Sequence, residues 1–246
     1  MPIHDWTRVP DGTFHHFHAT WIPLISSALN HGILPAGYYA MAEQIAGGFE
    51  PDVLTLQAIE SVDDDLERDE RGGTAIAVRP PKVSIQARLE QSLYAHKANR
   101  IVIRHRSRDR VVALVEIVSA GNKSSQRDFE AFVEKAASAI YDGIHVSLVD
   151  LHPPTSRDPQ GVHGAIWSDL GDNTYKAPTN KPLTLAANVG KPDFSAFVEP
   201  LAAGDVLPAL PVFLNPYRYV EVPLEESYMQ AVAEIPDRAR APLEPC

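Results

Sequence analysis

The sequence predicts an α/β protein with a mixed central sheet flanked by helices. Two β-branched runs, residues 111–119 and 143–151, flank a segment at 126–141 in which apolar residues recur at helical spacing. This order of strand, helix and strand indicates one βαβ unit with a parallel strand pair. Residues 100–106 alternate charged and apolar side chains, as a strand with one wet face does, and a turn at 107–110 leads into the run at 111–119.

The amino-terminal part predicts an irregular arm followed by one amphipathic helix. Apolar residues recur at helical spacing over residues 13–30. Asp11 or Thr13 is expected to cap this helix, and Gly32 is expected to end it. Because proline lacks the backbone N–H and clashes with the preceding turn, Pro23 should kink the helix or divide it into two pieces.

Two further strands are expected before the βαβ unit. Residues 38–44 and 52–57 have strand character and are joined by a glycine-containing loop, so the two strands should pair as a hairpin. The acidic run at 58–75 is expected to be a solvated loop, since runs of like charge are normally exposed.

The carboxy-terminal part predicts an irregular extension of the same domain. No long linker separates residues 152–246 from a core at residues 1–151, so the extension should wrap that core. The extension is rich in proline and contains three short strand-like runs and one amphipathic helix, at residues 183–187, 194–200, 212–214 and 224–233.

Composition limits the class of protein. The 246 residues carry a formal net charge of −10 and a pI of about 5.4. This argues against a surface built throughout for phosphate backbones but leaves room for a local basic strip. The lone cysteine, Cys246, excludes a disulfide within the chain and a cysteine-based metal site. Without an apolar run of membrane-spanning length or a signal-like start, we expect a cytoplasmic protein that no membrane holds.

Glu116 is the residue at which chemistry is first expected. It interrupts an apolar strand, and burying an unpaired carboxylate is costly. Either Glu116 serves a site, or it forms a half-buried ion pair with Arg100 or Arg104 on the neighbouring strand. Asp52, directly after Pro51, has the same two interpretations: a site residue or a cap for the strand start.

Three short motifs carry a resemblance. Pro51-Asp52-Val53, the strand Val115-Glu116-Ile117-Val118-Ser119, and Lys135 eight residues before Gly143 resemble the PD-(D/E)XK restriction-endonuclease-like superfamily, in particular a bacterial branch whose lysine lies on the following helix. The opening Met1-Pro2-Ile3-His4-Asp5-Trp6-Thr7-Arg8-Val9 and the stretch at residues 43–48 resemble, over most of the chain, an uncharacterised bacterial family with a domain of unknown function.

The superfamily resemblance implies a fold, an activity and a set of site residues. The fold would be a restriction-endonuclease-like core, and the activity a Mg²⁺-dependent nuclease hydrolysing nucleic acid, often as a homodimer. Asp52 and Glu116 would be metal ligands, with Glu43 as a third acidic ligand. Lys135 or Lys123 would be the electrostatic helper.

The sequence also departs from that pattern. The superfamily's common lysine position, two residues after the glutamate, holds Val118, and the first helix has no glutamate, which leaves His18 for that role. These departures favour a catalytically inactive descendant that serves in binding or assembly. A third interpretation is a zinc or iron site, for which the candidate ligands on the arm and first helix are His4, Asp5, His15, His16 and His18.

Overall fold

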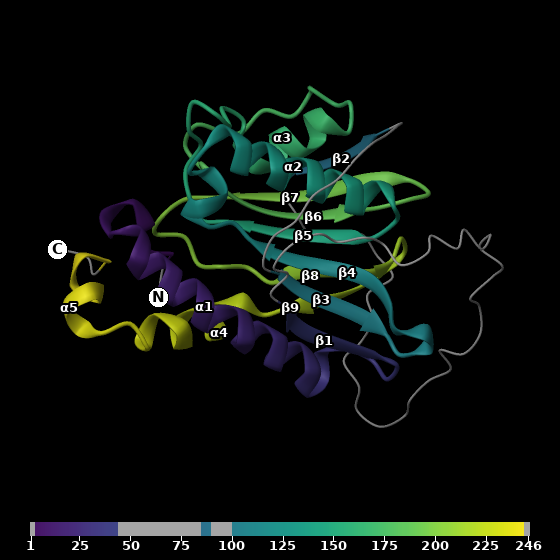
Figure 1. Ribbon diagram of the computed structural model, residues 1–246, viewed down its shortest axis with the longest axis horizontal. Coiled ribbons are helices and arrows are strands. Elements are labelled where there is room, and N and C mark those ends of the chain that lie inside the picture. Colours follow the sequence, from purple (N-terminus) through teal and green to yellow (C-terminus); the bar gives the residue numbers. More distant parts are fainter. Residues whose placement is uncertain (1–2, 44–84, 90–99, 244–246) are drawn as a thin grey trace.

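The computed structural model describes residues 3–43, 85–89 and 100–243, and it contains a seven-stranded mixed sheet (Figure 1). The strands, in their order across the sheet, are β1 (Tyr38–Glu43), β3 (Arg100–His105), β4 (Arg110–Ile117), β5 (His145–Asp150), β6 (Leu183–Val189), β7 (Phe194–Leu201) and β2 (Ile85–Leu89). The α/β class with a mixed sheet flanked by helices is therefore confirmed.

The predicted βαβ unit is present. Strands β4 and β5 are parallel, whereas every other strand pair that the structure describes in this sheet is antiparallel. Helix α2 (Gln126–Tyr141) makes the crossover between them, with the bounds that the sequence predicts. Its start is fixed by Ser125, whose side chain accepts a hydrogen bond from the Asp128 backbone N–H.

Helix α1 (Asp11–Ala28) contains Pro23 and continues through it, so of the two expected effects of this proline, a kink or a division, the division does not occur. Pro23 and Ala19, whose carbonyl loses its usual donor, are both exposed, and water can satisfy that carbonyl. The residue at the amino-terminal cap is Pro10, and neither of the expected side-chain caps is used. The wide turn η2 (Leu29–Ile33) follows α1, and within it Gly32 adopts φ 110°, which ends the helix as predicted.

The first strand, at one edge of the described sheet, pairs with a strand that is distant in the chain. β1 lies antiparallel to β3, so its partner is a strand more than fifty residues later in the chain. The expected partner at residues 52–57 lies outside the described residues, as does the acidic run at 58–75. The strand at residues 100–106 is confirmed as β3, and it pairs antiparallel with β4 as expected. The expected wet face is wrong, because residues 100–103 are all buried.

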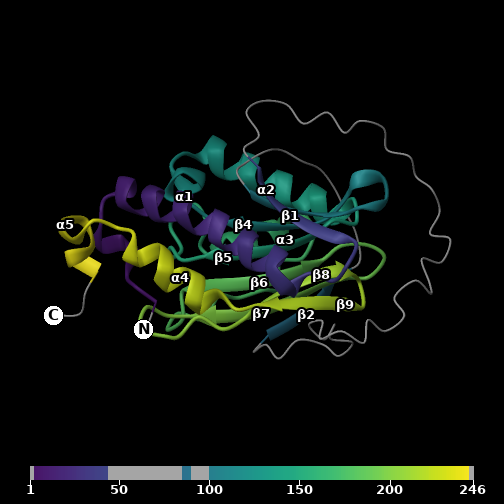
Figure 2. The same ribbon diagram turned by 90° about the horizontal axis from the view of Figure 1, so that it is seen from below.

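The two faces of the sheet are covered by different elements (Figures 1 and 2). Helices α2 and α3 (Gly161–Asp169) cover one face. The other face packs against α1, α4 (Leu224–Ala233) and a two-stranded sheet formed by β8 (Leu210–Asn215) and β9 (Arg218–Val222). The short helical turns are η1 (Trp6–Arg8), η3 (Ser107–Asp109), η4 (Ala120–Lys123), α5 (Asp237–Arg240) and η5 (Ala241–Leu243).

The two ends of the described chain meet in one aromatic cluster beneath α1. Trp6 packs on Phe17 with ring centroids 4.3 Å apart, and Tyr228 of α4 lies edge-on to Phe17 at 5.2 Å. The backbone N–H of His4 donates to the Tyr228 hydroxyl at 3.0 Å. The amino-terminal arm, expected to be irregular, is therefore part of the core.

The carboxy-terminal part contributes strands to the central sheet. β6 and β7 continue the central sheet beyond β5, which corrects the expected irregular extension around a core at residues 1–151. Helix α3 and strand β9 were not expected from the sequence. Two glycines weaken the helical pattern of the α3 sequence. One of them, Gly164, is required by packing, because a Cβ there would lie 2.6 Å from the Gln160 Cβ.

Candidate active site at the end of strand β4

Glu116 faces helix α2 from the next-to-last position of β4. Its neighbours Val115 and Ile117 belong to the core on the α1 side, whereas Leu114 and Val118 belong to the core beneath α2. Since side chains alternate along a strand, Glu116 points toward α2. Its side chain is only 2% exposed, so a carboxylate is held inside an apolar layer.

Lys135 is the partner of this carboxylate. Its Nζ lies 3.2 Å from Glu116 Oε1, and the lysine is 6% exposed. Burial raises the pKa of Glu116, and the positive charges of Lys135 and Arg100 partly oppose that rise. Burial lowers the pKa of Lys135, and the negative charge of Glu116 opposes that fall. The structure thus brings together two of the residues that the sequence singles out.

The second carboxylate oxygen of Glu116, Oε2, is buried, and Oε1 is the oxygen that forms the close ion pair with Lys135. Oε2 has no hydrogen-bond partner among the described residues, and the same holds for Lys135 Nζ by hydrogen-bond geometry, although its ion pair with Oε1 is close. Native proteins rarely leave a buried carboxylate oxygen without a donor or a cation. Glu116 Oε2 is therefore available as a ligand atom for a cation.

Arg100 completes the buried charges around Glu116. Ile101 pairs with Val115, so Arg100 lies in the row of Glu116, and its charge acts on the pKa of both Glu116 and Lys135. Arg100 also pairs through the backbone with Glu43, the last residue of β1. The alternative partner for Glu116, Arg104, instead lies 3.6 Å from Asp109. Asp52 lies outside the described residues.

Lys123 belongs to a separate buried cluster. Its Nζ lies 2.9 Å from both Asp150 Oδ2 and Asp158 Oδ2 and donates to the His152 carbonyl at 3.2 Å. Asp158 also accepts from the backbone and the hydroxyl of Thr155, which fixes the loop before α3. Lys123 thus holds two carboxylates of its own, and of the two candidate lysines Lys135 is the one beside Glu116.

Sequence reasoning overlooked Asp150 and Asp158. A usable signal was present, because Asp150 ends the second β-branched run just as Glu116 lies near the end of the first. Polar residues that end two parallel strands meet at one edge of the sheet, where sites in α/β proteins usually form. Burial raises the pKa of Asp150, and the Lys123 charge opposes that rise.

The four histidines near the amino terminus do not converge. His15 and His16 are exposed, whereas His18 is buried and its Nε2 lies 3.0 Å from the Ile117 carbonyl. The Nδ1 of His4 lies 2.8 Å from the Tyr228 hydroxyl. Within residues 3–43, 85–89 and 100–243 no group of three or more His, Cys, Asp or Glu side chains is arranged to hold a metal ion.

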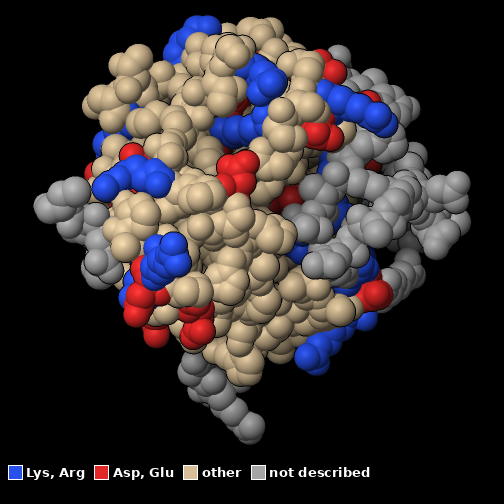
Figure 3. Space-filling model, turned by 60° about the vertical axis from the view of Figure 1, so that its left-hand side comes forward, with Lys and Arg blue, Asp and Glu red and all other residues tan. Residues whose placement is uncertain are grey.

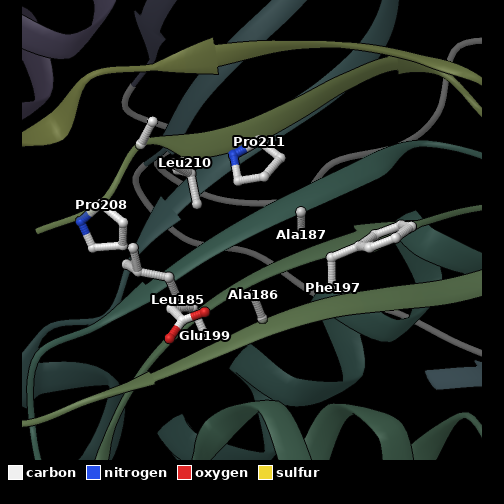
Figure 4. Close-up of a pocket in the computed structure, with 9 residues that line it drawn as sticks. Leu185, Ala186, Ala187, Phe197, Glu199, Pro208, Leu210 and Pro211 are labelled. Atoms are coloured by element: carbon white, nitrogen blue, oxygen red, sulfur yellow. The ribbon is translucent and has the colours of Figure 1, made fainter. Parts of the chain in front are cut away.

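A hollow lies on the face of the sheet opposite to Glu116, and its described lining has no group of catalytic side chains. Figure 4 shows it between strands β6 and β7 and the chain entering β8, lined mainly by apolar side chains. Among the residues that the structure describes, Glu199 is the one ionisable residue in its lining. Leu185 and Leu210 belong to the core on the α1 side, so this hollow and Glu116 lie on different faces.

Three buried histidines predict acid sensitivity. Burial lowers the pKa of His145 and His152 to about 4 and that of His163 to about 3. The unfolded chain therefore binds protons first as the pH falls, so stability present above about pH 6.5 is lost progressively toward the folded pKa values. Each buried ring should cost about 2 kcal/mol between pH 6.5 and 5.

Urea unfolding of wild type and His163→Gln at these two pH values measures this effect. We expect a smaller pH dependence in the variant, because His163 is 1% exposed between Trp167 and Tyr175. His15→Gln, at an exposed position of α1, is the matched control and should retain the wild-type slope. An identical slope in His163→Gln and wild type would contradict the assignment.

In comparisons with protein-family models, curated proteins and solved structures, no match was found for this chain. Among the described residues, no helix has both the length and the apolar character needed to cross a bilayer.

Proposed function

We propose that the protein is a Mg²⁺-dependent phosphodiesterase acting on nucleic acid, with Glu116 as a metal ligand and Lys135 as its electrostatic helper. The observation that carries the proposal is the 3.2 Å contact between Lys135 Nζ and Glu116 Oε1. A glutamate strand followed by a helix that bears the lysine is the arrangement expected from the resemblance to endonuclease-like proteins. By the same resemblance we expect the enzyme to act as a homodimer.

The carboxylate fits a hard divalent cation. Mg²⁺ prefers oxygen ligands, and the buried Oε2 of Glu116 lacks a hydrogen-bond partner among the described residues. By resemblance, Asp52 and Glu43 are the other acidic ligands. When bound, Mg²⁺ would polarise the phosphate and lower the pKa of a water molecule.

Lys135 supplies the charge that the reaction needs. In hydrolysis a water oxygen bonds to phosphorus, the bond to the leaving oxygen breaks, and negative charge accumulates on the phosphoryl oxygens. A fixed ammonium in a poorly solvated site stabilises that charge more than it would in water. Glu116 holds Lys135 in place and favours its protonated form despite burial.

The experiment is nicking of supercoiled plasmid DNA in Mg²⁺ and in EDTA. We expect wild type to nick only in Mg²⁺, Glu116→Gln to be inactive, and Lys135→Met to lose about 100-fold or more. Glu134→Gln, at an exposed position next to Lys135 on the same helix, is the control and should keep wild-type activity. Full activity in Glu116→Gln would refute the proposal.

One observation favours a second function, a catalytically inactive nuclease fold used for binding or assembly. Glu116 and Lys135 are 2% and 6% exposed, and a buried pair of this kind also has a purely structural use. Thermal melting with added Mg²⁺ or Mn²⁺ separates the two functions, because a ligand that binds the folded state raises the melting temperature. No shift together with no nicking would support the inactive protein.

A further inference from the structure

The hairpin of β3 and β4 concentrates positive charge in an acidic protein. Five of the fifteen arginines lie within residues 100–110, against a single acidic residue, although the whole chain has a net charge of −10. Four side chains define a surface that we call the arginine tip: Arg104, Arg106 and Arg110 of the hairpin and Arg218 at the start of β9.

The arginine tip is folded as a unit. Tyr38 lies opposite His105 across β1 and β3, and His105 lies opposite Arg110 across β3 and β4. Burial raises the pKa of Tyr38, and the charges of Arg110 and Arg218 oppose that rise. Tyr38 in turn lies edge-on to His105, with ring centroids 4.8 Å apart. The backbone N–H of Arg106 donates to the Gly37 carbonyl at 2.7 Å. The pairing of β1, β3 and β4 thus fixes where Arg106 and Arg110 are presented.

The positive charge of the tip is only partly neutralised. Asp109 pairs with Arg104 and accepts from the Tyr39 hydroxyl. No ion pair joins Arg106, Arg110 or Arg218 to an acidic group in the part of the chain that the structure describes. Arg106 and Arg110 are exposed. On the face seen in Figure 3, by contrast, basic and acidic side chains are interspersed.

We propose that the arginine tip binds the phosphodiester backbone of a nucleic acid. Arginine matches phosphate oxygens with several donors, and backbone contacts need no particular base sequence. Arg110 of the tip is the first residue of β4. Glu116 lies near the other end of that strand, about 20 Å from Arg110 along the extended chain. In Figure 1 the hairpin turn lies at the end of the molecule away from both termini.

At this distance, the arginine tip would bind one part of the nucleic acid while another part is hydrolysed at Glu116. The choice of nucleic acid as partner rests on the proposed function, but binding at the tip requires neither Mg²⁺ nor Glu116. The tip can therefore be tested by binding in EDTA, and the active site by cleavage.

The experiment measures fluorescence anisotropy of labelled duplex DNA and duplex RNA in EDTA, with wild type and Arg106→Gln/Arg110→Gln. We expect the variant to bind about tenfold more weakly and the slope of log affinity against log salt to fall by about two, because each lost phosphate contact removes about 0.9 from it. The matched control is Arg127→Gln/Arg238→Gln, which removes two exposed arginines that lie outside the tip, on helices α2 and α5.

Each outcome decides the proposal. Weaker binding of DNA or RNA with a reduced salt slope, in the tip variant only, supports it. Equal loss in the control variant, no loss in either, or no wild-type binding overturns it. Tighter binding of a labelled polyglutamate peptide than of nucleic acid, lost in the tip variant, would assign the surface to an acidic protein and also overturn it. Binding without Mg²⁺-dependent nicking would refute only the proposed hydrolysis.

Discussion

Lys123→Met is expected to be the most destabilising of the substitutions proposed for this protein, with a loss of about 4 kcal/mol or more in the free energy of unfolding. Removing one partner of a buried ion pair typically costs 3–5 kcal/mol, because the remaining charge is left uncompensated. Here two carboxylates lose their common partner, since Lys123 Nζ lies 2.9 Å from both Asp150 and Asp158. Urea unfolding at neutral pH measures the loss.

The loss should depend on pH in a definite direction. Burial already raises the pKa of Asp150, and without Lys123 nothing as close would oppose that rise. A carboxyl group whose pKa is raised by folding binds protons more readily in the folded state, so stability falls as the pH rises above the unfolded value. The defect of Lys123→Met should therefore be smaller near pH 5 than at pH 7.

Two further variants make this prediction specific. Lys181→Met removes a lysine from the half-exposed pair with Asp205, and the stability should change little. Asp150→Asn/Asp158→Asn placed on Lys123→Met removes the uncompensated charges and should recover part of the loss. A Lys123→Met protein as stable as Lys181→Met would show that the cluster is dispensable.

The pair of Glu116 and Lys135 should behave differently from its single mutants. Glu116→Leu leaves the ammonium of Lys135 buried, and Lys135→Met leaves the carboxylate of Glu116 buried, so each should cost about 3–5 kcal/mol. The double variant replaces both charges by apolar groups in an apolar layer beneath α2, and it should be close to wild type in stability. Urea unfolding of the four proteins gives the coupling energy directly.

This cycle is informative whether or not the protein is an enzyme. A double variant that is as stable as wild type but has lost the Mg²⁺-dependent nicking of wild type would show that the charges are kept for chemistry and not for stability. Additive losses would contradict a direct interaction across the 3.2 Å contact. Glu134→Gln is again the surface control.

Local patterns were sufficient for the centre of the fold. The helix at residues 126–141 has a serine cap and one apolar face, and its bounds are those of α2. The single acidic residue in the β4 run indicates Glu116, because a buried carboxylate in an apolar strand is costly. Its partner Lys135 follows from no local pattern, and only the resemblance offers it, together with Lys123.

The features that the sequence does not predict depend on contacts between residues that are distant in the chain. Lys123 resembles any polar-loop lysine until Asp150 and Asp158, 27 and 35 residues later, fold against it. β6 and β7 join the central sheet because β5 offers them an edge, which no short pattern records. Pro23 looked like a helix breaker because the exposure of Ala19, which makes the proline tolerable, is a tertiary property.

The aromatic cluster beneath α1 bears on how the protein is made. His4 and Trp6 complete their packing only on Tyr228, which is 224 residues after His4 in the chain. This part of the core cannot close until α4 has left the ribosome. A chain stopped by a premature codon before α4 would leave Trp6, Phe14 and Phe17 without their cover and become a substrate for cellular proteases.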